Sequence, residues 1–174
     1  NCPDVALSDT DCQKIPIDNL SREQAVLIYS QGGVNNWNQF GPWYENRKIV
    51  ACLRHAGSGT HATLDAAVMR GDGTLLSTQN TSIFAGILAY FNDGSGDMMS
   101  CIDENAGKVD GTTTYGAIGY ADADQLTGTQ KNNVHLLKYQ GVEPFKKKIT
   151  NCEYDFWSAQ WLFYNPSEVG ANPT

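Results

Sequence analysis

The residues best suited to chemistry lie between Arg54 and Thr60, where a β-rich run ends and a helical pattern begins. The first N–H groups of a helix have no intrahelical partner and carry the positive end of its dipole. Glycines let the backbone approach an anion closely. Ser58 and Thr60 add hydroxyl donors, and the planar fork of Arg54 suits two oxygens of one oxyanion. The stretch therefore predicts an oxyanion-binding turn. The alternative is a plain strand-to-helix turn with a surface arginine.

Two further motifs overlap this stretch. Residues 57–62 match G-x-G-x-x-A, the dinucleotide fingerprint, which also needs an acid at the end of a following strand about 20 residues on. That region is turn-like at 72–73 and 79–80, so a nucleotide-using enzyme is kept only as an alternative. A nucleophile elbow fails because Ala56 and Thr60 stand at its two glycine positions, and no Walker sequence occurs.

Catalytic and metal sites are not expected from the remaining polar residues. The histidines are scattered, and the cysteines form neither a C-x-x-C pair nor a zinc-finger spacing with a histidine. The acids near the start of the chain do not have the spacing of a calcium loop. The sequence therefore predicts no catalytic group, no metal ligand and no cofactor.

Helical and strand patterns alternate along the chain, which favours the α/β class. Ser21 and Gln24 form a capping box that opens a helix to about residue 31, and Trp37 anchors a turn. Residues 48–53 are expected to form a buried strand, and residues 84–91 fit either a strand or a short buried helix. Further helices are expected at 61–69, 93–105 and 143–149, and further strands at 5–7, 116–120, 134–137 and 161–164.

Length and composition limit the number of domains and the classes of partner that this protein can have. A chain of 174 residues fits one domain or slightly more. The net charge of −7 speaks against nucleic acid or an anionic membrane surface as the main partner, because both require clustered Lys and Arg. The longest nearly apolar run, 83–91, is far shorter than the roughly 20 residues of a membrane-spanning helix. Five cysteines allow at most two internal disulfides. Composition alone fits disulfides in an oxidising compartment and buried thiols in a reducing compartment equally well.

A set of ordered motifs over about residues 4–164 resembles the phosphate-binding solute receptors of ABC transporters, a family of type II periplasmic binding proteins. The loop at 54–60 is similar to the family's R-x-D-G-S-G-T phosphate loop, with Ala56 where Asp is usual. The other matches, in the family's order, are the strand 4–9 ending in Ser8 and Asp9, the segments 20–29 and 36–38, the helix start 95–97, the GAIGY strand 116–120 and the return 141–154.

This resemblance implies an α/β, type II periplasmic-binding-protein-like fold with one complete lobe and a partial second lobe, shortened at both ends. Residues 13–127 would form the lobe that carries the anion loop, 1–12 and 128–165 the partial first lobe, and 166–174 a tail. The implied ligand-binding residues are Asp9, Ser8, Arg54, Ser58, Gly59 and Thr60. Asp9 would accept a hydrogen bond from a protonated phosphate oxygen and so disfavour sulfate.

The function implied is capture of phosphate or a related oxyanion by a periplasmic or extracellular domain, without chemistry. Its partners would be an ABC transporter permease, a companion segment that completes the first lobe, or a second copy of the chain. The alternative is a sensory or protein-interaction domain that has lost anion binding, which exposed Trp37, Trp43 or Trp157 would favour. In such a compartment at least one disulfide is expected, with Cys2–Cys12 as the favoured pair.

Overall fold

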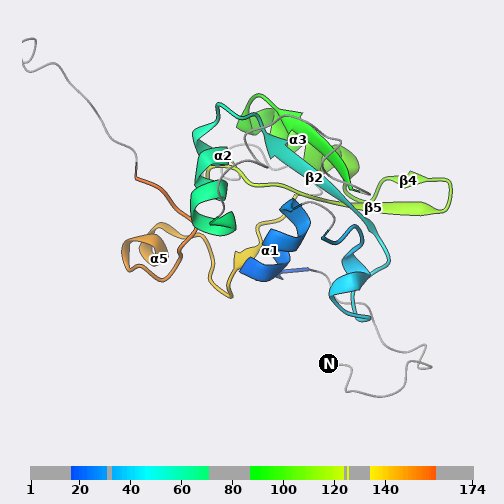
Figure 1. The fold of residues 1–174 in the computed structure, drawn as a ribbon, viewed down its shortest axis with the longest axis horizontal. Helices are drawn as coiled ribbons and strands as arrows, with labels where there is room; N and C mark the ends of the chain where they lie inside the picture. The colour runs from blue at the N-terminus through cyan, green and yellow to red at the C-terminus, as the bar shows by residue number, and fades with distance from the viewer. Residues whose placement is uncertain (1–16, 31–32, 71–86, 124, 126–133, 160–174) are drawn as a thin grey trace, which may run out of the picture.

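The computed structural model describes residues 17–30, 33–70, 87–123, 125 and 134–159, and Figure 1 shows their arrangement. A four-stranded sheet has the order β3-β2-β5-β4. Strand β2 (Lys48–Arg54) lies parallel to β3 (Leu88–Asn92) on one side and to β5 (Thr113–Ile118) on the other. The short β4 (Val109–Asp110) pairs antiparallel with β5. The α/β class and the buried strand at 48–53 are thereby confirmed.

Strand β2 is apolar on both faces because helices cover both. Helix α3 (Ser95–Asn105) lies on one side of β2 and α1 (Arg22–Tyr29) on the other (Figure 1). A disulfide between Cys52 and Cys101 joins β2 to α3, so the side chain of Cys52 faces that helix. Successive strand residues point to opposite faces, and all five residues from 49 to 53 are buried, as expected for a central parallel strand.

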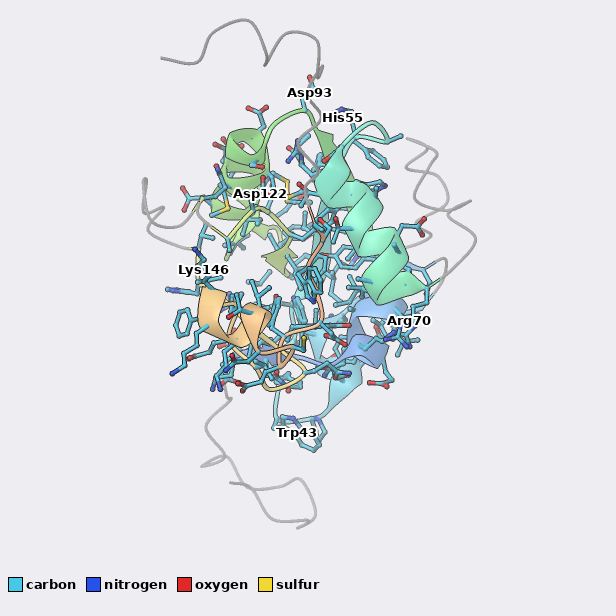
Figure 2. The ribbon with its side chains drawn as sticks, turned by 90° about the vertical axis from the view of Figure 1, so that its left-hand side faces the viewer. Trp43, His55, Arg70, Asp93, Asp122 and Lys146 are labelled. Carbon is cyan, nitrogen blue, oxygen red and sulfur yellow. A yellow bond between two sulfur atoms is a disulfide. The ribbon has the colours of Figure 1, made fainter. Side chains whose placement is uncertain are left out.

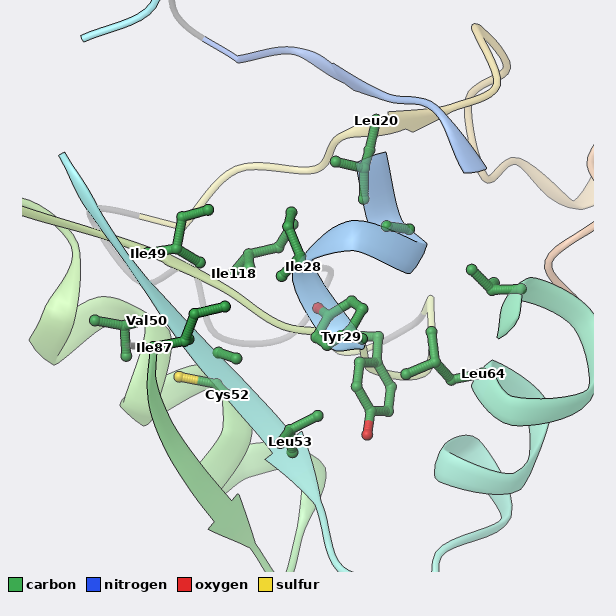
Figure 3. Close-up of a cluster of buried hydrophobic side chains, with 14 of the residues drawn as sticks. Leu20, Ile28, Tyr29, Ile49, Val50, Cys52, Leu53, Leu64, Ile87 and Ile118 are labelled. Atoms are coloured by element: carbon green, nitrogen blue, oxygen red, sulfur yellow. The ribbon is translucent and has the colours of Figure 1, made fainter. Parts of the chain in front are cut away.

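Helix α1 begins where the capping box predicts. The Ser21 hydroxyl accepts a hydrogen bond from the Gln24 N–H, and the Gln24 side chain accepts one from the Ser21 N–H at 2.8 Å. Its apolar face buries Ala25, Ile28 and Tyr29 in the core that Figure 3 shows beside β2. The predicted turn around Trp37 is a short 3₁₀ helix, η1 (Trp37–Phe40), and the Trp37 indole is buried.

A continuous helical segment follows β2. It consists of α2 (Gly59–Thr63) and a π-helical stretch, η2 (Leu64–Met69), so the helix expected at 61–69 is confirmed. It starts earlier than predicted because the Ser58 hydroxyl caps it. The ambiguity at 84–91 is decided in favour of a strand, β3, for the part of that segment that the structure describes. The glycine-led helix expected at 93–105 is confirmed as α3.

A second, two-stranded parallel sheet joins β1 (Asn19–Leu20) to β6 (Lys138–Tyr139), and α5 (Lys146–Thr150) follows it. The strand predicted at 134–137 was wrong. Residues 134–137 are irregular, and Leu136 is half exposed. The backbone that pairs comes later, where Lys138 and Gln140 donate to the carbonyls of Asp18 and Leu20. The apolar pattern was present, but the partner strand set the register.

Some expectations lie outside the described residues. They concern the strands at 5–7 and 161–164, the ligand roles of Ser8 and Asp9, and the Cys2–Cys12 pair. No helix in the described ranges is long and apolar enough to cross a membrane.

Candidate oxyanion-binding site

The candidate site lies where the carboxyl ends of the three parallel strands meet. Arg54 ends β2, Asp93 follows β3, and Tyr120 and Asp122 follow β5. In open α/β sheets ligands bind outside this edge. Figure 2 shows His55, Asp93 and Asp122 at this end of the molecule, with Trp43 at the opposite end.

The guanidinium of Arg54 is positioned by neutral acceptors from the start of α3. Its Nη1 donates to the Ser95 hydroxyl at 2.7 Å, and its Nη2 donates to the Asp93 carbonyl at 2.9 Å. Its Nε is buried and has no hydrogen-bond partner among the described residues. These two contacts hold the guanidinium in place, and neither acceptor is a carboxylate. The positive charge therefore stays available to an anion.

The backbone of Arg54 is held by Tyr120. The Arg54 N–H donates to the Tyr120 hydroxyl oxygen at 3.0 Å, and the same hydroxyl contacts Nδ1 of the buried His61 on α2. Burial is the largest cause of the raised pKa of Tyr120, so the phenol keeps its proton at neutral pH. A protonated phenol can accept from Arg54 and still donate to His61. The ends of β2 and β5 and the first turn of α2 are thereby tied together.

The loop after Arg54 presents the first turn of α2. The Ser58 hydroxyl accepts from the His61 N–H at 3.4 Å, and Ser58 is buried. A Cβ built on Gly59 would meet nothing within 4 Å, so the backbone at the helix start faces open space. The loop borders a groove of about 1320 Å³, and Arg54, Ser58, Gly59 and Thr60 all line it. The four predicted site residues in the described ranges are thus brought to one cavity.

Asp122 stands across this loop. One carboxylate oxygen accepts from the Thr60 hydroxyl at 3.3 Å, and the other accepts from the Ser95 hydroxyl at 3.2 Å. Sequence reasoning missed Asp122, and it gave no ligand role to Ser95 or Tyr120. The available signal was positional, because all three closely follow strands whose carboxyl ends share an edge with Arg54. That signal is useful only once the strand order is known.

The described residues contain no group of three or more His, Cys, Asp or Glu side chains arranged to hold a metal ion. The hydrogen-bond donors at this loop are N–H groups, hydroxyls and the Arg54 guanidinium, which suit an oxyanion, and the Asp122 carboxylate accepts from two of the hydroxyls.

Comparison with known proteins agrees with the motifs. A family model described as PBP superfamily domain matches residues 10–173. A protein from Clostridium perfringens, assigned as a phosphate ABC transporter substrate-binding protein and solved with bound phosphate, is 27% identical. That match covers 80% of this chain and 46% of that chain, with a TM-score of 0.57.

Two further solved structures share the fold. PstS from Borrelia burgdorferi is 17% identical over 82% of this chain and 50% of that chain, with a TM-score of 0.62. An ABC-type phosphate transport receptor from Vibrio cholerae is 21% identical over 81% of this chain and 48% of that chain, with a TM-score of 0.58.

The chain belongs to the PBP superfamily and has the type II periplasmic-binding-protein fold that its motifs implied. It spans about half the length of the solved structures it matches. The structures from Clostridium perfringens and Vibrio cholerae carry the names of transport proteins, not of enzymes.

Proposed function

We propose that this domain binds phosphate or a related oxyanion at the Arg54 loop and performs no chemistry on it. The observation that carries the proposal is the clamped guanidinium of Arg54. It lies at the carboxyl end of β2, is held by Ser95 and Asp93, and borders the same groove as Ser58 and Thr60. A planar cation beside a helix start and two hydroxyl-bearing residues are the kinds of group that bind a tetrahedral oxyanion.

Ala56 leaves the Arg54 guanidinium without a carboxylate partner in its own loop. The phosphate loop that this segment resembles usually has Asp at that position, and an alanine offers no carboxylate to pair with Arg54. Ser8 and Asp9 complete the proposed ligand set. Asp9 accepts a hydrogen bond from a protonated ligand oxygen in this proposal, and Ser8 supplies a hydroxyl.

The wider assignments are also proposals. The division into a lobe at 13–127, a partial lobe at 1–12 and 128–165, and a tail at 166–174 follows the motifs. Delivery of the anion to an ABC transporter permease, and a periplasmic or extracellular location, follow from the kind of proteins to which the chain is similar. The Cys52–Cys101 disulfide supports an oxidising compartment.

Calorimetric titration of the full chain with inorganic phosphate tests the proposal. We expect Arg54→Gln to weaken phosphate binding roughly 10- to 100-fold, because a hydrogen bond to a charged group contributes about 1.5–3 kcal/mol. Arg70→Gln is the matched control, since Arg70 is exposed at the far end of the α2–η2 segment (Figure 2). Absence of phosphate binding in the unaltered protein, or equal affinity in both variants, contradicts the proposal.

A second candidate is a sensory or protein-interaction domain that has lost anion binding. Trp43 and Trp157 favour it, because their side chains are 42% and 46% exposed, whereas Trp37 is buried and does not. Trp157 also borders the groove. This candidate predicts no phosphate binding, so the titration above separates the two.

A further inference from the structure

The groove that borders the anion loop is much larger than a tetrahedral oxyanion. Its volume is about 1320 Å³, whereas pockets of roughly 300–1000 Å³ already hold drug-sized ligands. The donors that the proposed function assigns to an anion are gathered at one loop, at Arg54, Ser58 and Thr60. A bare phosphate bound at this loop would leave most of the groove unfilled.

Aromatic side chains form another part of the groove wall. The segment 134–159 contributes Tyr139, Tyr154, Phe156 and Trp157 to it. The Tyr139 ring packs against Tyr154 and Phe156, with ring centroids 6.1 and 6.0 Å apart. These three rings are buried or half-buried, whereas the Trp157 side chain is 46% exposed. An exposed indole on a groove wall offers a ligand a flat apolar face.

Hydrogen bonds place Trp157 close to the anion loop. The Thr63 hydroxyl donates to the carbonyl of Gly59, the first residue of α2, at 2.9 Å, and it lies 3.0 Å from the Ser158 hydroxyl oxygen. The chain after α5 therefore runs up to α2 (Figure 1). Thr63 is about one helical turn beyond Gly59, a rise of roughly 6 Å. Because Trp157 directly precedes Ser158, it borders the groove next to the turn that carries the proposed anion donors.

We propose that the preferred ligand of this groove is an organic phosphate monoester with an aromatic body, and that Trp157 binds that body. The inference rests on the proposed function, because the Arg54 loop holds the phosphoryl group. A monoester leaves the other phosphoryl oxygens free for the guanidinium and the start of α2. Its ester oxygen carries the aromatic ring along the groove wall to Trp157. Stacking on the indole buries apolar surface of both rings and adds the attraction of an aromatic pair.

Calorimetric titration of the full chain with inorganic phosphate and, separately, with phenyl phosphate tests the inference. We expect phenyl phosphate to bind about tenfold more tightly than inorganic phosphate, because its ring is removed from water. Trp157→Ala removes this advantage and leaves the affinity for inorganic phosphate unchanged, whereas Trp157→Phe keeps a ring and retains most of it. Trp43→Ala is the matched control, since Trp43 is similarly exposed and lies at the opposite end of the molecule from the site (Figure 2).

Arg54→Gln tests whether the two ligands use one site. It should weaken the binding of phenyl phosphate and of inorganic phosphate by the same factor, because both phosphoryl groups bind the same guanidinium. If phenyl phosphate keeps its full affinity in Arg54→Gln, its ring binds independently of the anion loop and the inference is wrong. Thermal unfolding of each variant verifies that it is folded.

The outcomes separate this inference from the proposed function. If inorganic phosphate binds and phenyl phosphate binds no more tightly, the groove does not accept the aromatic body, and the inference is wrong while the proposed function stands. If Trp157→Ala keeps the advantage of phenyl phosphate, or loses no more of it than Trp43→Ala does, Trp157 does not bind the ring. If neither ligand binds the unaltered protein, both proposals are wrong.

Discussion

The backbone N–H of Arg54 donates a hydrogen bond to the phenolic oxygen of Tyr120 at 3.0 Å. The two residues are 66 positions apart in the chain, and each lies at or just beyond the carboxyl end of a strand in the same sheet. The contact fixes the point at which the chain leaves β2, which is also the point at which the guanidinium enters the proposed site.

Tyr120→Phe should therefore lower both stability and anion affinity. It removes the acceptor of the Arg54 N–H and the hydroxyl that contacts His61 Nδ1, and loss of a partner from a buried polar group costs about 1–3 kcal/mol. Urea unfolding measures the stability, and phosphate titration measures the affinity. Tyr90→Phe serves as the control because the Tyr90 side chain is 42% exposed. Equal unfolding midpoints in the two variants would show that the hydroxyl is not needed.

Arg54 and Ser58 should differ in how much they contribute to anion binding. Arg54→Ala removes a charged donor, expected to contribute about 1.5–3 kcal/mol, whereas Ser58→Ala removes a neutral hydroxyl that contributes about 1. Ser58→Ala should also destabilise the fold by roughly 1 kcal/mol, since its hydroxyl caps α2. Titration calorimetry and thermal unfolding measure the two effects. Equal losses of affinity would count against the Arg54 clamp.

Thiol labelling under non-reducing conditions tests the cysteine pairing. Cys52 and Cys101 are joined, and Cys152 is exposed and free. If Cys2 and Cys12 also pair, denatured but unreduced protein takes a single label, at Cys152. Three labels would leave the Cys52–Cys101 bond intact and refute the Cys2–Cys12 pair, and five labels would refute both.

Alkaline pH should destabilise the protein through its buried tyrosines. Burial is the largest cause that raises the pKa of Tyr154 to about 12, from 10.0 in an unperturbed tyrosine. Between these values the unfolded chain releases a proton that the folded chain retains, so stability is full below pH 10.0 and is lost as the pH rises toward 12. Tyr29, which is also buried, acts in the same direction.

Urea unfolding at a series of alkaline pH values measures this loss. Tyr154→Phe should make the decline shallower, because it removes one group whose pKa burial raises. A decline of the same steepness in Tyr154→Phe and in the unaltered protein would show that Tyr154 ionises equally easily in both states.

Self-association through a sheet edge at residues 5–7 or 161–164 stays a prediction, because both segments lie outside the described residues. An edge strand offers unpaired N–H and C=O groups to another chain. Light scattering should report a mass above the 19.0 kDa of one chain, unless a companion segment is supplied. A monomer that binds phosphate tightly would contradict this expectation.

Local features of this protein were readable from the sequence because neighbouring residues create them. The hydroxyl and amide of Ser21 and Gln24 satisfy the helix start between themselves. The run at 48–53 is apolar at nearly every position, as a strand buried on both faces requires. The glycines and hydroxyls after Arg54 predict the strand-to-helix loop for the same reason, since the loop and its helix are contiguous, while anion binding there stays a proposal.

Only the tertiary structure decided which distant residues join that loop. The approach of Ser95, Tyr120 and Asp122 to the Arg54 loop depends on β3 and β5 flanking β2, and the Cys52–Cys101 bond depends on α3 crossing that sheet. The strand expected at 134–137 failed for a related reason, because β6 forms where β1 provides hydrogen-bond partners. Strand order and register are set by backbone pairing between segments far apart in the chain, and the residue pattern within each segment does not encode its partner.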